Sequence, residues 1–181
     1  MNDLLQSTLL VGLLPQVRLL AEAHRMEMQR RNVVIKFTQT LRTDAQQDAL
    51  YEKGRTTPGV LCRHTHDPRP RPLGACPVHP LGLTVTRARA GQSWHNAMPV
   101  DWPLIGCRAY DVAIVTYEGD KTPQYLYDGP WDLVGQTGEA LGLEWGGRWK
   151  SGSDLPHFQL LEGLTLYRAK VPTAFPPASG G

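Results

Sequence analysis

Asp154 and His157 lie three residues apart in the stretch 144–159, with Pro156 between them. Because proline is not tolerated inside a helix, this stretch is expected to be extended, and both side chains can then lean toward one point. A carboxylate and an imidazole placed in this way could supply one general base and one zinc ligand. The same short pattern also fits an ordinary histidine in a surface loop, so further candidates are needed.

Two more side chains with suitable chemistry occur earlier in the chain. His95 follows a strand-like alternation, and Asp111 enters a run of β-branched residues at 109–117. Asp111 shares its face of that run with apolar residues, so its carboxylate needs a partner, for which a metal ion is well suited. Two histidines and one carboxylate leave zinc an open fourth position for water, as in a catalytic site. Zinc lowers the pKa of that water toward about 7, and a nearby carboxylate can take its proton.

The hydrophobic pattern and turn signals predict the scaffold for these residues. The expected elements are a helix from Pro15 to about Met28 with His24 on its face, a strand at 33–37, a helix between the capping box of Thr43 and Gln46 and the stop at Gly54, strands at 83–90 and 109–117, a helix from Pro130 to Gly142, and a strand at 164–171. This order predicts an α+β domain. A small, mainly antiparallel sheet would hold the metal on one face and helices on the other.

One domain is expected over residues 1–171, with a long insertion at about 60–83 that is too rich in proline for a helix or a central strand. The insertion contains five possible metal ligands, namely Cys62, His64, His66, Cys76 and His79. They could hold a second, structural zinc ion, and the alternatives are a plain loop or a disulfide between the two cysteines. The tail 172–181 is expected to be disordered because proline, glycine and small residues dominate it.

Composition excludes several classes of function. A formal net charge of +2 could favour an anionic polymer such as a cell wall, but it is too small for a nucleic-acid-binding protein, so no such partner is expected. No stretch reaches the ~20 apolar residues that a membrane-spanning helix needs. The first 20 residues lack both a positive segment and a cleavage site, so no signal peptide is expected. The product should be soluble and retained where it is made.

Four segments resemble, in the same order, the L-alanyl-D-glutamate peptidases of phages and bacteria, which are relatives of the D-alanyl-D-alanine carboxypeptidases and dipeptidases. These segments are TQTLRTDAQQDALYEKGRTTPG (38–59), VTRARAGQSWHN (85–96), AYDVAIV (109–115) and LGLEWGGRWKSGSDLPHFQ (141–159). The resemblance runs from about residue 14 to residue 159. Four matching pieces are far more specific than a lone D-x-x-H, and they imply the α+β architecture predicted above.

The resemblance also implies roles for individual residues. The implied zinc ligands are His95, Asp111 and His157. Asp154 would be the general base, and Arg42 would steady the substrate and the oxyanion of the tetrahedral intermediate. Ser93 would orient the site through a hydrogen bond. Trp145 and Trp149 fit either a substrate groove or packing.

The sequence departs from the family in the position of the ligand aspartate. Members of the family usually place it seven residues after the histidine, within a G-x-A-x-D pattern, whereas Asp101 lies six and Asp111 sixteen residues after His95. We assign Asp111, because it keeps the A-x-D spacing and leads into an unbroken strand. Asp101 runs into Pro103, which would remove a donor from a sheet ladder. Residues 97–108 would then form a loop over the site.

The function implied is that of a phage endolysin. Such a zinc peptidase would hydrolyse the peptidoglycan stem peptide between L-alanine and D-glutamate and so degrade the bacterial cell wall. The alternatives are a D-alanyl-D-alanine or L,D-carboxypeptidase and a non-catalytic, zinc-containing module that binds the cell wall. Peptidoglycan is the expected partner, and the chain is expected to be a monomer. The enzyme would stay in the host cytoplasm until its release to the cell wall at lysis.

Overall fold

A computed structural model of the protein describes residues 9–60, 74, 76, 78–98, 101, 103–118, 122–150 and 152–165. Its elements, in chain order, are α2 (Pro15–Arg30), β1 (Val34–Gln39), α3 (Asp44–Glu52), β2 (Ala109–Glu118), β3 (Thr122–Tyr125), α4 (Trp131–Ala140), β4 (Glu144–Trp145), the 3-10 turn η2 (Gly146–Arg148) and β5 (His157–Gln159). None of the described helices is long and apolar enough to cross a membrane.

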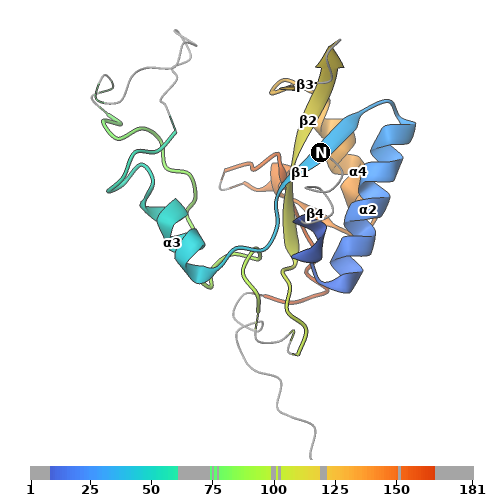
Figure 1. The fold of residues 1–181 in the computed structure, drawn as a ribbon, viewed down its shortest axis with the longest axis horizontal. Coiled ribbons are helices and arrows are strands. Elements are labelled where there is room, and N and C mark those ends of the chain that lie inside the picture. Colours follow the sequence, from blue (N-terminus) through green and yellow to red (C-terminus); the bar gives the residue numbers. More distant parts are fainter. Residues whose placement is uncertain are drawn as a thin grey trace, which may run out of the picture.

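The five strands form one sheet in the order β1, β2, β5, β4, and β3 pairs with the far end of β2. Every pairing is antiparallel. The helices α2 and α4 lie side by side against one face of this sheet, whereas α3 stands off on the other side (Figure 1). The predicted α+β fold with an antiparallel sheet is therefore confirmed.

The hydrophobic core lies between the sheet and the pair of helices α2 and α4. Alternate residues of β2 point into it, as the two-residue period of a strand requires. Its fully or almost fully buried members include Val17, Met28, Phe37, Tyr110, Val112, Ile114, Val134 and Phe158. Close approach of α4 depends on Gly138, because a Cβ atom there would lie 2.5 Å from the ring of Phe158.

His24 belongs to this core, as its place on a helix face suggested. Its Nε2–H donates to the carbonyl oxygen of Val134 at 2.9 Å, and Nδ1 accepts from the Tyr110 hydroxyl at 2.9 Å. The ring also meets that of Phe158 edge-on, with 4.7 Å between centroids. Burial lowers the pKa of His24 from 6.5 to about 4, so the imidazole is neutral at pH 7.

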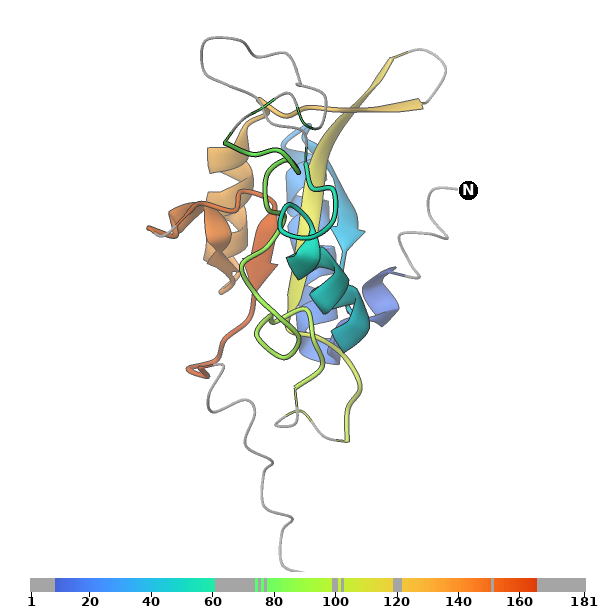
Figure 2. The same cartoon turned by 90° about the vertical axis from the view of Figure 1, so that its left-hand side faces the viewer.

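The helix α3 begins at the predicted capping box. The Thr43 hydroxyl accepts from the backbone of Gln46 at 3.2 Å, and the Gln46 side chain accepts from the backbone of Thr43 at 2.9 Å. Figure 2 shows α3 in front of the sheet, on the face away from α2 and α4. The helix α3 also holds the segment that precedes His95, because the Gln47 side chain donates to the Ala88 carbonyl oxygen at 2.7 Å.

The predicted strand at 83–90 is wrong. Beyond one isolated bridge between Val60 and Leu83, this segment is irregular. Its backbone groups find side-chain partners on α3 instead of a neighbouring strand, for example Ala90 N–H, which donates to Asp48 at 2.8 Å. Of the strand predicted at 164–171, the first two residues are irregular and the rest lie outside the described residues. Residues 61–73 of the insertion predicted at about 60–83, and the tail 172–181, also lie outside them.

Candidate metal centre

Three side chains from distant parts of the sequence meet at one point on the sheet face opposite α2 and α4. His95 Nε2 lies 3.1 Å from Asp111 Oδ1 and 3.2 Å from His157 Nδ1, and the last two atoms are 3.1 Å apart. His95 and His157 are almost fully buried, and Asp111 is partly exposed. The three atoms form a nearly equilateral triangle.

Two of these residues are placed by strand pairing. Asp111 of β2 lies directly opposite His157, the first residue of β5, so their side chains leave the sheet on the same face. His95 comes from an irregular turn whose backbone is tied to the end of β1, because Arg42 N–H donates to the His95 carbonyl oxygen at 2.8 Å. The Ser93 hydroxyl accepts from the backbone N–H of His95 at 3.3 Å. In the structure Ser93 therefore holds the turn, and its contact is with the backbone and not with the imidazole.

The second nitrogen of each imidazole is turned away toward an oxygen. His95 Nδ1 lies 2.8 Å from the Thr40 carbonyl oxygen, and His157 Nε2 lies 2.9 Å from Gln159 Oε1. Because these oxygens only accept, each of these nitrogens carries the ring proton. In a neutral imidazole the other nitrogen, which here faces the Asp111 carboxylate, is then the one with a lone pair available to a metal ion.

With both imidazoles neutral, three lone pairs converge here, and a cation between them would relieve their repulsion. Zinc bonds of 2.0–2.1 Å place the ligand atoms of a tetrahedral site about 3.3 Å apart, close to the three separations here. Burial alone would raise the pKa of Asp111, but His95 and His157, where their imidazoles are protonated, outweigh burial through their charge and hydrogen bonds and hold that pKa well below its usual range. The carboxylate is thus ionised. The residues fit a divalent metal ion with one coordination position left open.

Arg42 lies at the edge of this centre. Its NH2 group donates to Asp111 Oδ2 at 2.9 Å, and its NH1 group donates to Gln47 Oε1 at 3.3 Å. Among the described residues, nothing accepts a hydrogen bond from its buried Nε. The guanidinium is therefore fixed beside the three converging atoms, where it can also bind a negatively charged oxygen.

Asp154 occupies a turn that leads into β5. Its backbone N–H donates to the Gly146 carbonyl oxygen at 3.0 Å, and its own carbonyl oxygen accepts from His157 N–H at 3.1 Å. The residue is exposed to solvent, yet neighbouring protein atoms partly desolvate its carboxyl group. This desolvation and the negative charge of Asp111 raise the pKa of Asp154. A carboxylate with a raised pKa is better suited to accept a proton near neutral pH.

The alternative aspartate lies elsewhere. Asp101 forms an ion pair with the buried Arg108, whose NH2 group is 2.6 Å from Asp101 Oδ1, and Arg108 also contacts Glu162 at 2.8 Å. The structure thus brings Asp111, and not Asp101, to the two histidines. Asp101 instead helps Arg108 to fasten the loop before β2 to the segment after β5.

The two tryptophans differ in their surroundings. Trp145 is buried in the core, and its Nε1–H donates to the Leu155 carbonyl oxygen at 2.8 Å. Trp149 stands beside the metal centre, with its ring centroid 5.0 Å from that of His157 and its Nε1 2.6 Å from Glu144. Only Trp149 is therefore placed to line a substrate site.

Sequence reasoning missed Gln159 and Thr40, which fix the two imidazoles. Gln159 stands two residues after His157 on the same strand face, within the segment that resembles the family, and this spacing could have revealed it. Thr40 acts through its backbone carbonyl oxygen, which no side-chain pattern reports. In the insertion, Cys76 Sγ lies 3.7 Å from His79 Nδ1, while Cys62, His64 and His66 lie outside the described residues.

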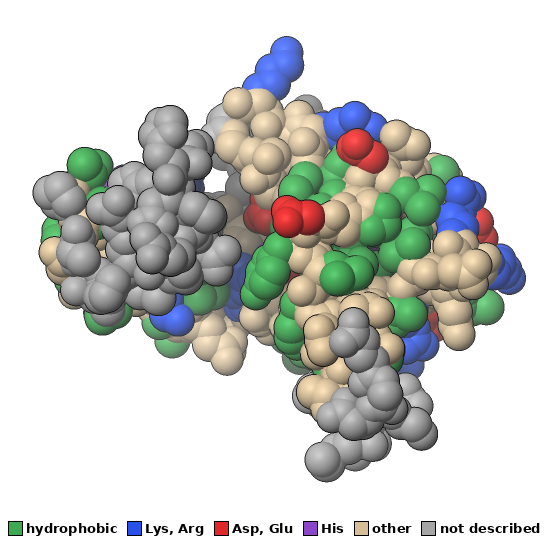
Figure 3. Space-filling model, turned by 90° about the horizontal axis from the view of Figure 1, so that it is seen from above, with side chains coloured by type: hydrophobic (Ala, Val, Ile, Leu, Met, Phe, Trp, Pro, Cys, Tyr) green, Lys and Arg blue, Asp and Glu red, His purple; other side chains and the backbone are tan. Residues whose placement is uncertain are grey.

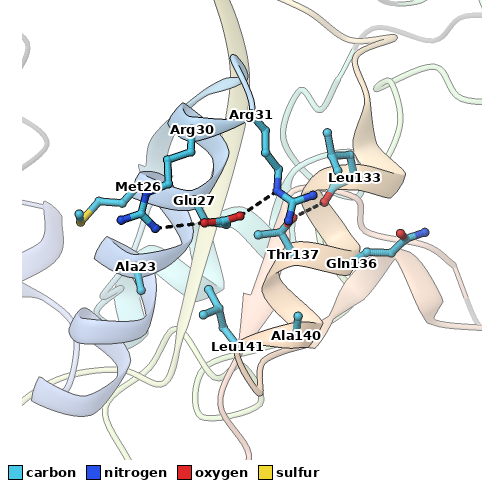
Figure 4. A pocket seen from close by; sticks show the side chains of 10 residues that line it. All are labelled: Ala23, Met26, Glu27, Arg30, Arg31, Leu133, Gln136, Thr137, Ala140 and Leu141. Carbon is cyan, nitrogen blue, oxygen red and sulfur yellow. Dashed lines mark hydrogen bonds and ion pairs between the residues drawn. The ribbon is translucent and has the colours of Figure 1, made fainter.

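A hollow of about 560 Å³ lies on the other side of the sheet, between α2 and α4 (Figure 4). Its rim carries Glu27, which pairs with Arg30 at 3.2 Å and with Arg31 at 3.0 Å. None of the candidate site residues lines this hollow. We therefore assign the chemistry to the three converging side chains.

Comparison with known proteins agrees with this assignment. Residues 87–160 match a family model described as D-alanyl-D-alanine carboxypeptidase. This range includes the three converging residues His95, Asp111 and His157, and also Asp154. The peptidoglycan L-alanyl-D-glutamate endopeptidase CwlK of Bacillus subtilis is 27% identical over 148 residues, which cover 81% of this chain and 72% of that protein. The solved structure of the Serratia marcescens L-Ala D-Glu endopeptidase ChiX gives a TM-score of 0.42 at 18% identity, covering 86% of this chain and 85% of that chain. The resemblance seen in the sequence is thus confirmed: residues 87–160 match a model of the M15 family of peptidases, and most of the chain is similar to an L-alanyl-D-glutamate endopeptidase.

Proposed function

We propose that the chain is a zinc peptidase that hydrolyses the peptidoglycan stem peptide between L-alanine and D-glutamate. The observation that carries this proposal is the triangle of His95 Nε2, Asp111 Oδ1 and His157 Nδ1, with both ring protons turned away from it. The family match and the named activity of CwlK support the peptide substrate.

The ligands would be His95, Asp111 and His157, which leave one position of the ion open. Zinc held there would polarise the scissile carbonyl group and lower the pKa of water toward about 7. Asp154 would accept a proton from the attacking water and return it to the leaving amine. Arg42, already fixed by Asp111 and Gln47, would bind the oxyanion that develops on the carbonyl oxygen.

The description of the matched family supports a second candidate, a carboxypeptidase that releases D-alanine. Both substrates carry a free carboxylate on the carbon next to the scissile nitrogen, so Arg42 could serve either one. The choice between them rests on CwlK, whose match covers 81% of this chain. A non-catalytic binding module remains the alternative from another class, and it has no use for a base at Asp154.

Digestion of purified peptidoglycan tests the proposal. With zinc present, new L-alanine carboxyl ends and D-glutamate amino ends should appear in equal amounts, and Asp154→Asn should slow their appearance at least about a hundredfold while zinc content is kept. Release of D-alanine would instead identify the carboxypeptidase. Intact peptidoglycan after digestion with zinc-loaded protein would leave only the binding module.

The phage lysis role, the storage in the host cytoplasm and the monomeric state stay predictions.

A further inference from the structure

The sheet face that carries Asp111 continues well beyond the metal centre. Val112 and Ile114 of β2 point into the core, so Asp111, Val115 and Tyr117 point to the opposite face. Val34 of β1 and Tyr125 of β3 both pair with Val115 and therefore share that face. Lys36 lies two residues from Val34 on the same face. We call Val34, Lys36, Tyr117 and Tyr125 the outer strip.

Much of the outer strip is open to solvent. The exposed fractions are 39% for Val34, 40% for Tyr117 and 54% for Tyr125. The Lys36 ammonium group lies 5.3 Å from the centre of the Tyr117 ring. Figure 3 looks down on the end of the molecule that carries β3 and shows hydrophobic side chains gathered there. Contiguous exposed apolar rings on a small domain mark a binding surface more often than chance.

We propose that the outer strip binds the glycan strand of peptidoglycan while the stem peptide occupies the metal centre. This inference rests on the proposed function and extends it from the cleaved bond to the polymer. The C–H faces of sugar rings pack on aromatic rings, and tyrosine hydroxyl and lysine ammonium groups at the edge can bind sugar hydroxyls. The outer strip offers these groups in one row.

Chain length supports the glycan as occupant. In peptidoglycan the L-alanine is joined directly to the glycan strand, and one residue spans at most ~3.6 Å. Tyr117 lies six residues from Asp111 along β2, a distance of ~20 Å at the usual rise of a strand. On the L-alanine side of the scissile bond, the peptide is therefore far too short to reach Tyr117. On that side of the bond, only the polymer to which the alanine is attached can reach it.

Charge sets the direction in which the substrate lies. The residues after the scissile bond carry carboxylates, and a cationic group stands on the α3 side of the centre. There the guanidinium groups of Arg55 and Arg89 lie 3.9 and 4.1 Å from the centre of the Tyr51 ring. Tyr51 is one helical turn from Gln47, which contacts Arg42. The acidic peptide end therefore fits the α3 side, and the sugar end fits the outer strip.

The test compares two substrates and one ligand with the variant Tyr117→Ala/Tyr125→Ala. Hydrolysis of a soluble stem peptide without sugar should be unchanged, whereas kcat/KM on glycan-bearing fragments should fall about tenfold, mainly through KM. Peptide-free glycan oligosaccharides should bind the wild type, as measured by calorimetry, and should bind the variant about tenfold more weakly. The control is Tyr127→Ala, which removes a tyrosine that is 79% exposed but lies beyond β3, and it should behave as wild type.

Three outcomes would overturn the inference. They are an equal loss on the sugar-free peptide, unchanged binding of glycan by the variant, and a loss in the control as large as in the variant. Because glycan binding is measured without turnover, failure of the outer strip is distinct from failure of the proposed peptidase. A protein that cleaves neither substrate but binds glycan through Tyr117 and Tyr125 would refute the peptidase and keep the outer strip.

Discussion

His95 Nε2 and His157 Nδ1 lie 3.2 Å apart, although each ring has its proton bound to an oxygen on its far side. With both rings neutral, neither nitrogen can donate to the other in this arrangement. Both nitrogens also face the Asp111 carboxylate, so a cation between them would stabilise the contact. This contact is the basis of the predictions on metal binding.

Metal binding should stabilise the fold. An ion that binds only the folded state at a hundred times its dissociation constant adds about 2.7 kcal/mol to the free energy of unfolding. A chelator should therefore lower the midpoint of thermal unfolding, and zinc should restore it. In His95→Ala, neither addition should shift the midpoint. If zinc restores this variant as fully as wild type, the ion binds elsewhere, and the insertion with Cys76 and His79 becomes the first place to look.

Asp154→Asn should separate catalysis from metal binding. The amide cannot accept a proton from water, so we expect kcat to fall by roughly 10² to 10⁴ while one zinc ion per chain is retained. Elemental analysis and a stem-peptide hydrolysis assay measure the two quantities. Ser153→Ala, a change at the exposed neighbour, is the matched control and should leave both unchanged. Loss of zinc in Asp154→Asn would show that Asp154 is a ligand.

Gln159 should act as a positioning residue for His157. In Gln159→Ala the ring loses the acceptor that holds its Nε2–H, and we expect zinc affinity to fall about 10- to 100-fold. Gln159→Glu keeps an acceptor oxygen at the same place and should recover most of that affinity. Competition with a zinc-binding dye measures both variants. Equal affinities of Gln159→Ala and wild type would contradict the role, because a purely structural glutamine would change only the unfolding midpoint.

His24 should make stability depend on pH below neutrality. Its pKa is about 4 in the folded protein and 6.5 when exposed, so unfolding takes up a proton between these values. The free energy of unfolding should therefore rise with pH across that window and gain at most about 3 kcal/mol from this group. Urea titrations at pH 5 and pH 7 measure the difference. It should shrink in His24→Gln, which has no titrating ring, and an unchanged difference would assign the effect to other groups.

The sequence predicted the elements whose stability is mostly local. The capping box at Thr43, the proline at Pro15 and the alternation after Ala109 each determine a helix or strand through neighbouring residues, and the structure has α3, α2 and β2 there. The short strands β4 and β5 were missed, because two or three residues form a strand only through pairing with distant segments. The same reason explains the error at 83–90, where the alternation is present but no partner strand is.

The site was predictable to the extent that it consists of side chains. Residue types and family resemblance pointed to His95, Asp111 and His157, and the fold brings them together. The groups that orient them could not be read in the same way. Thr40 contributes a backbone carbonyl oxygen, and the partner of Asp101 is Arg108, a contact that depends on how the loop before β2 folds back.

The three converging atoms also belong to three separate segments of the chain. His95 and His157 are 62 residues apart, and β5, which carries His157, is only three residues long. An ion shared by both in the folded state would act as a cross-link across that loop, and its contribution to the stability of the fold is lost whenever the ion dissociates. Metal supply would then govern how long the folded enzyme survives as well as how fast it works, so protease resistance should follow zinc occupancy.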